Sequence, residues 1–129
     1  MELLIPISPG ELLDKLTILE IKLERMDSEA QLANVQREYD LLTEVWERSG
    51  SREASIAQLR ADLRKVNEAL WVIEDDIREE ERHKRFGERF IELARSVYVQ
   101  NDERAAVKKK INLALGSEIV EEKSYRDYR

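Results

Sequence analysis

Apolar residues between Ile56 and Ile77 recur at alternating intervals of three and four residues without an error. The members of this repeat are Ile56, Leu59, Leu63, Val66, Leu70, Ile73 and Ile77. This spacing places every member on one side of an α-helix and is typical of helices that pack side by side with a left-handed crossing. A strand would need alternation at every second residue. The segment therefore predicts one long helix over residues 52–84, about 45–50 Å long at ~1.5 Å per residue.

The N-terminal region predicts a helix over residues 9–26. Ser8-Pro9-Gly10-Glu11 is a typical helix start, in which Ser8 accepts from the amide of Glu11 and Glu11 reaches back to the amide of Ser8. An apolar stripe follows, made of Leu12, Leu16, Leu19, Leu23 and Met26. Ile18 and Ile21 fall outside that stripe. The helix is therefore apolar on two sides, and we expect it to be sandwiched between other elements or between subunits.

A second helix is predicted over residues 28–48, because the first stripe is broken at Asp27-Ser28 and a new one begins. The new stripe is Leu32, Val35, Tyr39, Leu42 and Trp46. Since Asp and Ser favour the first position of a helix, we expect a chain reversal there. A single bent helix is the alternative. Ser49-Gly50-Ser51 then separates this helix from the longer one, and we expect the two to form a hairpin whose overhanging end is covered by another element.

The C-terminal third predicts two shorter helices, over residues 88–99 and 102–115. Gly87 is expected to end the long helix, and Gly116 to end the last one. Asn101-Asp102 can cap a new helix, although a continuous register would also align Phe90, Ala94 and Val97. One uninterrupted helix therefore remains an alternative. In either case Ile91 and Tyr98 are expected to share one face with Phe90, Ala94 and Val97.

The tail, residues 117–129, carries Ile119-Val120 as an apolar anchor, and we expect it to be strapped across the body. Taken together, the segments predict an all-α fold in one domain, residues 1–129. Its architecture is an elongated antiparallel helical hairpin or bundle with a long central helix and a short C-terminal tail.

Composition excludes several functions. The net charge of −6 opposes long-range attraction to nucleic acid or to an anionic membrane, and the 6% of aromatic residues provides no stacking platform. Because the chain has no cysteine and only His83 as a histidine, thiol chemistry and mechanisms that need two imidazoles are excluded. No apolar stretch is long enough to span a membrane and no targeting segment is recognisable, so a cytoplasmic protein is expected.

An acidic run, residues 74–81, is the first candidate for chemistry. Asp76 and Glu80 are one helical turn apart, as are Asp75 and Glu79, and either pair has the oxygen ligands that Mg²⁺ or Ca²⁺ prefers. Interleaved basic residues favour a solvated helix face with internal ion pairs instead. We therefore expect no metal and no cofactor.

Two basic groups form a second candidate. Arg82, Lys84, Arg85 and Arg89 surround Phe86-Gly87, whereas Arg104, Lys108, Lys109 and Lys110 lie on the last helix. If the two groups fold side by side, they would create a local site for a small anion in an acidic protein. Solvated helix flanks are the more common explanation of such lysines.

Several sequence blocks resemble a family of small bacterial proteins with no assigned function. The blocks run from Pro9 to Lys22 (PGELLDKLTILEIK), from Phe86 to Ile91, around Val97-Tyr98 with Asn101, Asp102 and Arg104, and from Gly116-Ser117 to Tyr125. No mechanism is known for this family, so the resemblance assigns no catalytic residues to the present sequence.

The polar members of these blocks suggest a binding hypothesis. They are Asp14, Lys15, Asn101, Asp102, Arg104, Lys123 and Tyr125, to which Lys108 is added as the neighbouring cation. We expect the three regions that carry them to meet, either as a satisfied polar network or as a small cleft. Purely structural networks are the more common case, since buried polar groups need partners whatever the function.

The function predicted is a non-catalytic helical interaction or assembly module. The two-sided first helix and the overhanging long helix favour self-association as a symmetric homodimer, and a further protein partner fits the same hypothesis. The alternative is a small-molecule anion-binding protein, or an enzyme, with a site near Arg104 and Lys108.

Overall fold

The computed structural model describes residues 1–50 and 52–129 and shows an all-α fold. Four helices are present, α1 (Pro9–Arg25), α2 (Glu29–Arg48), α3 (Glu53–Arg82) and α4 (Glu88–Ala114), and the described residues contain no strand. None of these helices combines the length and the apolarity needed to cross a bilayer. Ser51, the last residue of the break predicted before the long helix, lies outside the described residues.

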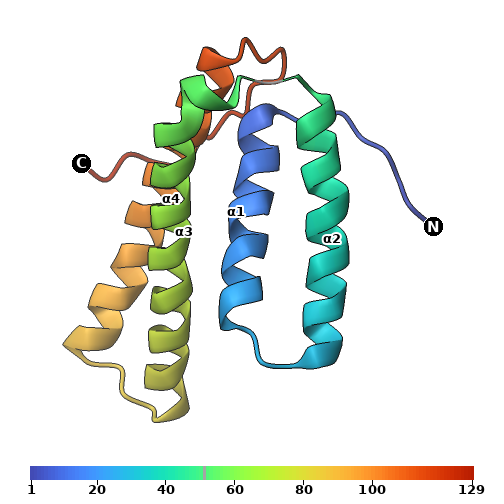
Figure 1. The fold of residues 1–129 in the computed structure, drawn as a ribbon. Helices are drawn as coiled ribbons and strands as arrows, with labels where there is room; N and C mark the ends of the chain where they lie inside the picture. Colours follow the sequence, from blue (N-terminus) through green and yellow to red (C-terminus); the bar gives the residue numbers. More distant parts are fainter. Residues whose placement is uncertain (51) are drawn as a thin grey trace.

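α1 is the central helix of the bundle. It packs against α2 on one side and against α3 and α4 on the other, while α3 and α4 lie antiparallel along each other (Figure 1). Its apolar residues are buried on both sides, as Leu13, Leu16 and Ile21 show. The two-sided pattern is therefore explained by elements of the same chain.

The hairpin of the second and third helices expected from the sequence is wrong. In the described part of the chain, α2 packs along α1 and not along α3, since α1 lies between them (Figure 1). The apolar stripe of α3 is used instead by α1 and α4, with Ile56 and Leu63 in the same core cluster as Leu16 and Ile111. α4 covers the end of α3 that extends beyond α1.

Serine caps start the first two helices. Ser8 Oγ accepts from the amide of Glu11 at 3.2 Å, and Ser28 Oγ accepts from the amide of Gln31 at 3.4 Å. The chain reverses between α1 and α2, where the interrupted stripe predicts a turn (Figure 1). The Glu11 side chain does not complete the expected capping box, because it pairs with Lys108 of α4.

α3 ends earlier than expected, and Lys84 rather than Gly87 adopts the left-handed conformation, with φ of 56°. The amide of Arg85 donates to the carbonyl of Glu80 at 2.9 Å and that of Lys84 to Glu81 at 3.0 Å. These two bonds form a Schellman motif, which usually places glycine at the left-handed position. Gly87 instead precedes the first residue of α4.

The two helices expected over residues 88–99 and 102–115 are one continuous helix, α4, and Asn101-Asp102 does not interrupt it. The packed face also differs from the expectation. Leu93 is buried, whereas Ile91 and Tyr98 are exposed. The face that meets α3 continues through Val97, Asn101 and Arg104, so polar residues occupy a stretch of the helix interface.

Candidate functional site

A buried lysine on α4 lies at the centre of a charged cluster. Lys108 is 8% exposed, and its ammonium lies 2.6 Å from Glu11 Oε2 and 3.6 Å from Asp14 Oδ2, both on α1. The third partner is Glu121 of the C-terminal tail, 3.3 Å away. One cation therefore joins the first helix, the last helix and the tail.

The close approach of α1 and α4 at this point depends on Gly10. Its amide donates to Asn112 Oδ1 at 2.8 Å, and a Cβ atom on it would lie 2.7 Å from the carbonyl oxygen of Lys108. Only glycine leaves room for the backbone of α4 here. The helix crossing then brings Glu11 within reach of Lys108.

Burial and charge act in opposite directions on Lys108. Burial lowers the pKa of its ammonium, but the hydrogen bond to Glu11 and the charges of Asp14, Glu11 and Glu121 outweigh it, so that the pKa is raised overall. The hydrogen bond from Lys108 in turn lowers the pKa of Glu11 below its ordinary range. Lys108 and Glu11 are therefore both ionised at neutral pH, and the Lys108 ammonium lies among carboxylate partners.

A buried amide connects this cluster to a second cation. Asn67 of α3 donates through Nδ2 to Asp14 Oδ1 at 2.9 Å and to Thr17 Oγ1 at 3.0 Å. Its Oδ1 accepts from Arg104 Nη1 at 3.2 Å. Asn67 occupies a position between Leu63 and Leu70 on α3, so a polar side chain interrupts the apolar face to serve both α1 and α4.

Arg104 differs from Lys108 in its partners. Its guanidinium donates to Asn67 Oδ1 and, at 2.8 Å, to Asn101 Oδ1, both neutral acceptors. Among the described residues it forms no ion pair, and two of its five N–H groups account for these bonds. It borders a shallow hollow of about 460 Å³ between α3 and α4, together with Trp71, Asp75 and Asn101.

The predicted site residues divide into two groups. Asp14, Asn101, Arg104 and Lys108 belong to the network around Asn67. Lys15 is an exposed residue of α1 whose charge also contributes to the lowered pKa of Glu11.

Asp102, Lys123 and Tyr125 lie together elsewhere, in a hollow of about 520 Å³ between α4 and the tail. The ammonium of Lys123 is 5.5 Å from the ring centre of Tyr125, which is itself largely exposed. The tail runs back along α4, because Glu121 pairs with Lys108 while the ring of Tyr128 packs edge-on against that of Tyr98 at 4.8 Å.

Ionic and aromatic contacts hold the tail, and Ile119 and Val120 are not the expected apolar anchor, since both are exposed. Loss of hydration and a hydrogen bond with Asp102 raise the pKa of Tyr128. The strap expected from the sequence is therefore present, with different residues attaching it to α4.

The two basic groups do not meet. Arg89 and Arg104 lie on the same continuous helix, fifteen positions apart, so their backbones are separated by roughly 22 Å at ~1.5 Å per residue. The acidic run carries ion pairs, with Asp76 bonded to Arg89 at 3.2 Å and Glu80 to Arg85 at 2.8 Å. No group of three or more metal-binding side chains is present in the described part of the chain.

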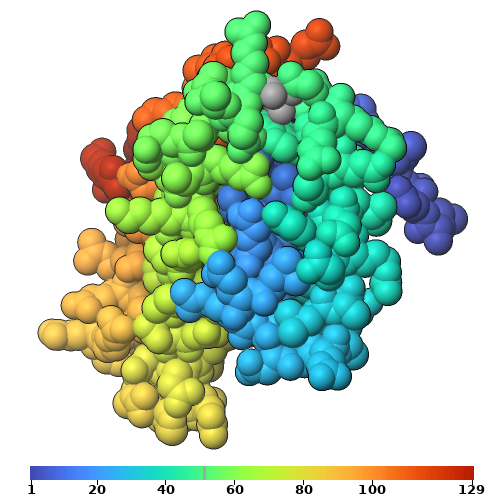
Figure 2. All heavy atoms as spheres, viewed as in Figure 1, coloured from blue at the N-terminus to red at the C-terminus, as the bar shows by residue number. Residues whose placement is uncertain are grey.

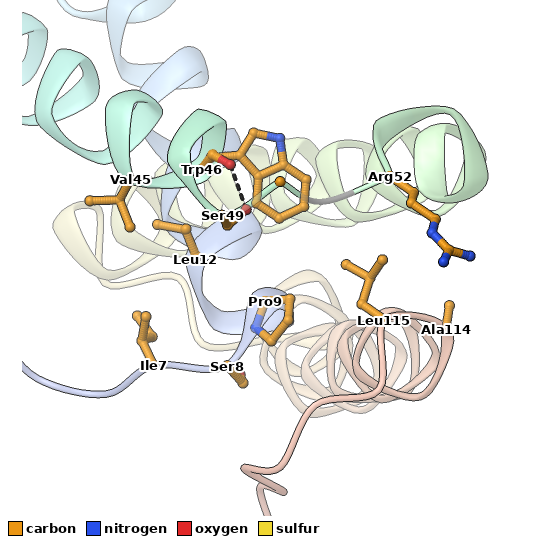
Figure 3. Close-up of a pocket in the computed structure, with 11 residues that line it drawn as sticks. Ile7, Ser8, Pro9, Leu12, Val45, Trp46, Ser49, Arg52, Ala114 and Leu115 are labelled. Carbon is orange, nitrogen blue, oxygen red and sulfur yellow. Dashed lines mark hydrogen bonds between the residues drawn. The ribbon is translucent and has the colours of Figure 1, made fainter.

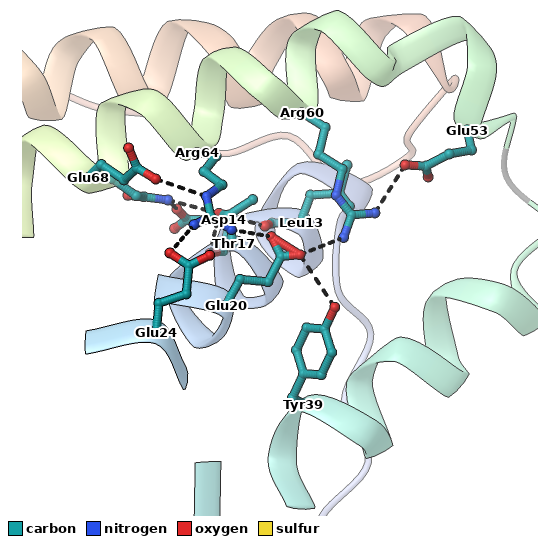
Figure 4. A network of polar contacts seen from close by, with 11 residues as sticks. Leu13, Asp14, Thr17, Glu20, Glu24, Tyr39, Glu53, Arg60, Arg64 and Glu68 are labelled. Carbon is teal, nitrogen blue, oxygen red and sulfur yellow. Dashed lines mark hydrogen bonds and ion pairs between the residues drawn. The ribbon is translucent and has the colours of Figure 1, made fainter. Parts of the chain in front are cut away.

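A second polar network, which joins α1 to α2 and α3, was not anticipated from the sequence (Figure 4). Glu20 accepts from Tyr39 of α2 at 3.3 Å and pairs with Arg60 at 3.4 Å and Arg64 at 3.5 Å, both on α3. Arg64 also pairs with Glu24 at 2.5 Å. The matched one-turn spacing of Glu20 with Glu24 and of Arg60 with Arg64 is the signal that could have revealed it.

A third feature is the end of the bundle where the N-terminal arm, residues 1–7, leaves α1. Leu3, Leu4 and Ile5 of the arm are 76%, 90% and 72% exposed, and the arm projects past α2 (Figures 1 and 2). At its root a hollow of about 540 Å³ opens between the start of α1 and the ends of α2 and α4 (Figure 3). We name it the end hollow; Ile7, Pro9, Leu12, Val45, Trp46 and Leu115 contribute to its lining.

Comparison with known proteins gives a family and nothing more specific. No curated protein and no solved structure matches the chain significantly. One family model matches the chain, and the match includes all four helices, most of the arm and nearly all of the tail. The chain therefore belongs to DUF6165, a family of unknown function, whose model matches residues 3–128.

Proposed function

We propose that this protein is a non-catalytic helical interaction module that associates with itself as a symmetric dimer through its N-terminal arm. The observation that carries the proposal is the arm itself, in which Leu3, Leu4 and Ile5 are largely exposed. Consecutive exposed apolar residues are unusual on a monomeric protein and mark surfaces that a partner covers. The proposed setting, a bacterial cytoplasm, is testable by cell fractionation.

The two sequence features that favoured self-association have partners within the same chain. The two-sided apolar pattern of α1 is used within the chain by α2, α3 and α4, and the overhanging end of α3 is covered by α4. Neither feature therefore requires a second subunit. The arm now supports the proposal instead, because the described residues of its own chain leave its apolar side chains exposed.

The energetics favour reciprocal use of two arms. Burying a leucine or isoleucine side chain contributes about 1.5–3 kcal/mol. The three side chains of one arm therefore contribute roughly 5–9 kcal/mol, and those of two arms roughly 9–18 kcal/mol. Association costs about 4–15 kcal/mol in lost translational and rotational freedom. One arm hardly offsets that cost, whereas two exchanged arms exceed it over most of the range.

The charged network supports a structural rather than a catalytic role. Lys108 has three carboxylate partners, and Asn67 has partners for both its amide nitrogen and its amide oxygen. Groups that are satisfied in this way hold helices together and are poorly placed to exchange protons with a substrate.

Light scattering coupled to size-exclusion chromatography tests the dimer. We expect a mass twice that of the chain, and a shift towards monomer when Leu3 and Leu4 are both replaced by serine. The matched control replaces Val72, an exposed apolar residue of α3, with serine and should leave the mass unchanged. A wild-type chain that is monomeric at high micromolar concentration would contradict the proposal.

A small-anion site at Arg104 is the second candidate, favoured because this guanidinium has only neutral acceptors in the described structure. A thermal-shift titration with inorganic phosphate and with succinate tests it. Stabilisation that is lost in Arg104→Gln would support an anion site. No stabilisation of the wild-type chain by either anion would rule these two ligands out.

A further inference from the structure

We infer that the end hollow of a second copy of this chain is the seat of the N-terminal arm, so that two copies exchange arms around a twofold axis. The inference rests on the self-association proposed above and names the surfaces that meet. The arm and the end hollow lie at the same end of the bundle, with Ile7 at the root of the arm also lining the hollow (Figure 3).

The arm of a given copy does not fill its own hollow. Figure 3 shows the chain before Ile7 leading away from the hollow, and Figure 2 shows the arm standing clear of the body beside α2. Leu3, Leu4 and Ile5 are absent from the residues that line the hollow. The end hollow is therefore open to an arm from another molecule.

The surface of the end hollow matches an apolar strand. Pro9, Leu12, Trp46 and Leu115 provide its apolar wall, and Val45 at its edge is 48% exposed. Leu41 lies one turn before Val45 on α2 and is 47% exposed, so the apolar surface continues beyond the hollow. A segment of consecutive leucine and isoleucine residues would cover this surface.

Charge complementarity gives the arm a direction. Glu2 is the only charged side chain of the arm, and Arg52 is the only charged residue among those described as lining the hollow. Figure 3 places Arg52 on the opposite side of the hollow from Ile7 and Val45. An arm seated with Leu4 near Val45 therefore brings Glu2, which lies on the same face of an extended chain as Leu4, towards Arg52, across about 7 Å at ~3.3 Å per residue.

Reciprocity follows from the position of the hollow. Because each copy carries both an arm and its seat at one end, a twofold axis near Ile7 satisfies both copies at once and leaves no open end for further growth. The dimer is then closed.

Disulfide cross-linking tests the seat directly, since the natural chain has no cysteine. Leu4→Cys and Val45→Cys are made in separate chains that carry tags of different mass, mixed, and oxidised. We expect a cross-linked species that contains one chain of each kind. The matched control pairs Leu4→Cys with Glu92→Cys, an exposed position in the first half of α4, and should give no mixed species.

The outcomes separate this inference from the proposed function. A dimeric wild-type chain without a Leu4–Val45 cross-link would overturn the seat and leave self-association standing. A monomeric wild-type chain would remove both. If Leu4→Cys and Val45→Cys in one chain form a disulfide within a monomer, while the mixed single variants do not link, the arm folds onto its own hollow and exchange is wrong.

A charged substitution at Val45 tests the same contact between arm and end hollow without the use of cysteine. Val45→Asp places a carboxylate where the arm would lie, and we expect at least about tenfold weaker dimerisation, because an unpaired charge is costly to bury. The side chain is half exposed in the free chain, so circular dichroism should show an unchanged helix content. Unchanged dimerisation of this variant would count against the seat.

Discussion

Replacing Lys108 with methionine removes the one cation that Glu11, Asp14 and Glu121 share. Methionine retains the apolar length of the lysine stem, so packing changes little and the lost charge dominates. Removing one partner of a buried ion pair costs about 3–5 kcal/mol. Only Asp14 is buried, since Glu11 and Glu121 retain access to water, and we expect a loss at the lower end, about 3 kcal/mol.

Urea unfolding followed by circular dichroism at neutral pH measures this loss. A chain of 129 residues is stable by roughly 6–19 kcal/mol, so the variant still folds. Lys109→Met is the matched control, because Lys109 is the next residue on α4 and is exposed. We expect it to change the free energy of unfolding by less than about 0.5 kcal/mol.

The pH dependence gives the prediction a sign. Lys108 lowers the pKa of Glu11 below its ordinary value of 4.5, so this stabilisation is present above pH 4.5 and is lost as the pH falls through the lowered pKa. At the alkaline end it is present below the ordinary lysine value of 10.5 and is lost as the pH rises through the raised pKa of Lys108. The cost of Lys108→Met should therefore be smaller at pH 3 than at pH 7.

Two results would refute this reasoning. If Lys108→Met and Lys109→Met have equal free energies of unfolding at pH 7, the cluster does not hold α1 to α4. If the cost of Lys108→Met is the same at pH 3 as at pH 7, ionised Glu11 does not contribute to it.

Two backbone predictions follow from the same helices. Lys84→Gly should raise the free energy of unfolding by about 1 kcal/mol, since it relieves a left-handed residue with φ of 56°, whereas Lys110→Gly inside α4 should lower it by a similar amount. If urea unfolding shows that both variants change the free energy of unfolding in the same direction, the result would be inconsistent with the Schellman motif. Gly10→Ala should cost about 1–3 kcal/mol, because its Cβ would lie 2.7 Å from the carbonyl oxygen of Lys108. Gly87→Ala, with open space around it, is the control, and equal melting temperatures for these two alanine variants would contradict the close crossing.

Local sequence signals located most helix ends. Ser8 and Ser28 cap the first two helices, and Gly116 takes the left-handed position after the last, with φ of 64°. These features depend on residues within a few positions of one another, which is why they can be read from the chain alone. Lys84 shows the limit of that reading, because a residue without a glycine's freedom occupies the left-handed position three residues before Gly87.

Asn101 shows how a distant partner overrides a local preference. Asparagine followed by aspartate favours a helix start, yet α4 continues through both. Asn101 accepts from Arg104 one turn later, and Arg104 reaches Asn67 on α3, so the side chain is engaged within the helix interface. Sequence blocks indicated that these polar residues belong together, but Asn67, which joins them, lay in a segment with no such signal.

The sequence by itself determined an all-α chain, the periodic faces of its helices and a first helix that is apolar on two sides, because side-chain spacing along a helix dictates which residues share a face. Only the tertiary structure decided that α1 separates α2 from α3, and that Lys108 is held by α1 and the tail together. An apolar stripe can pack against any complementary stripe, so periodicity carries no information about the partner. That choice depends on close approaches and buried charges contributed by residues far apart in the chain.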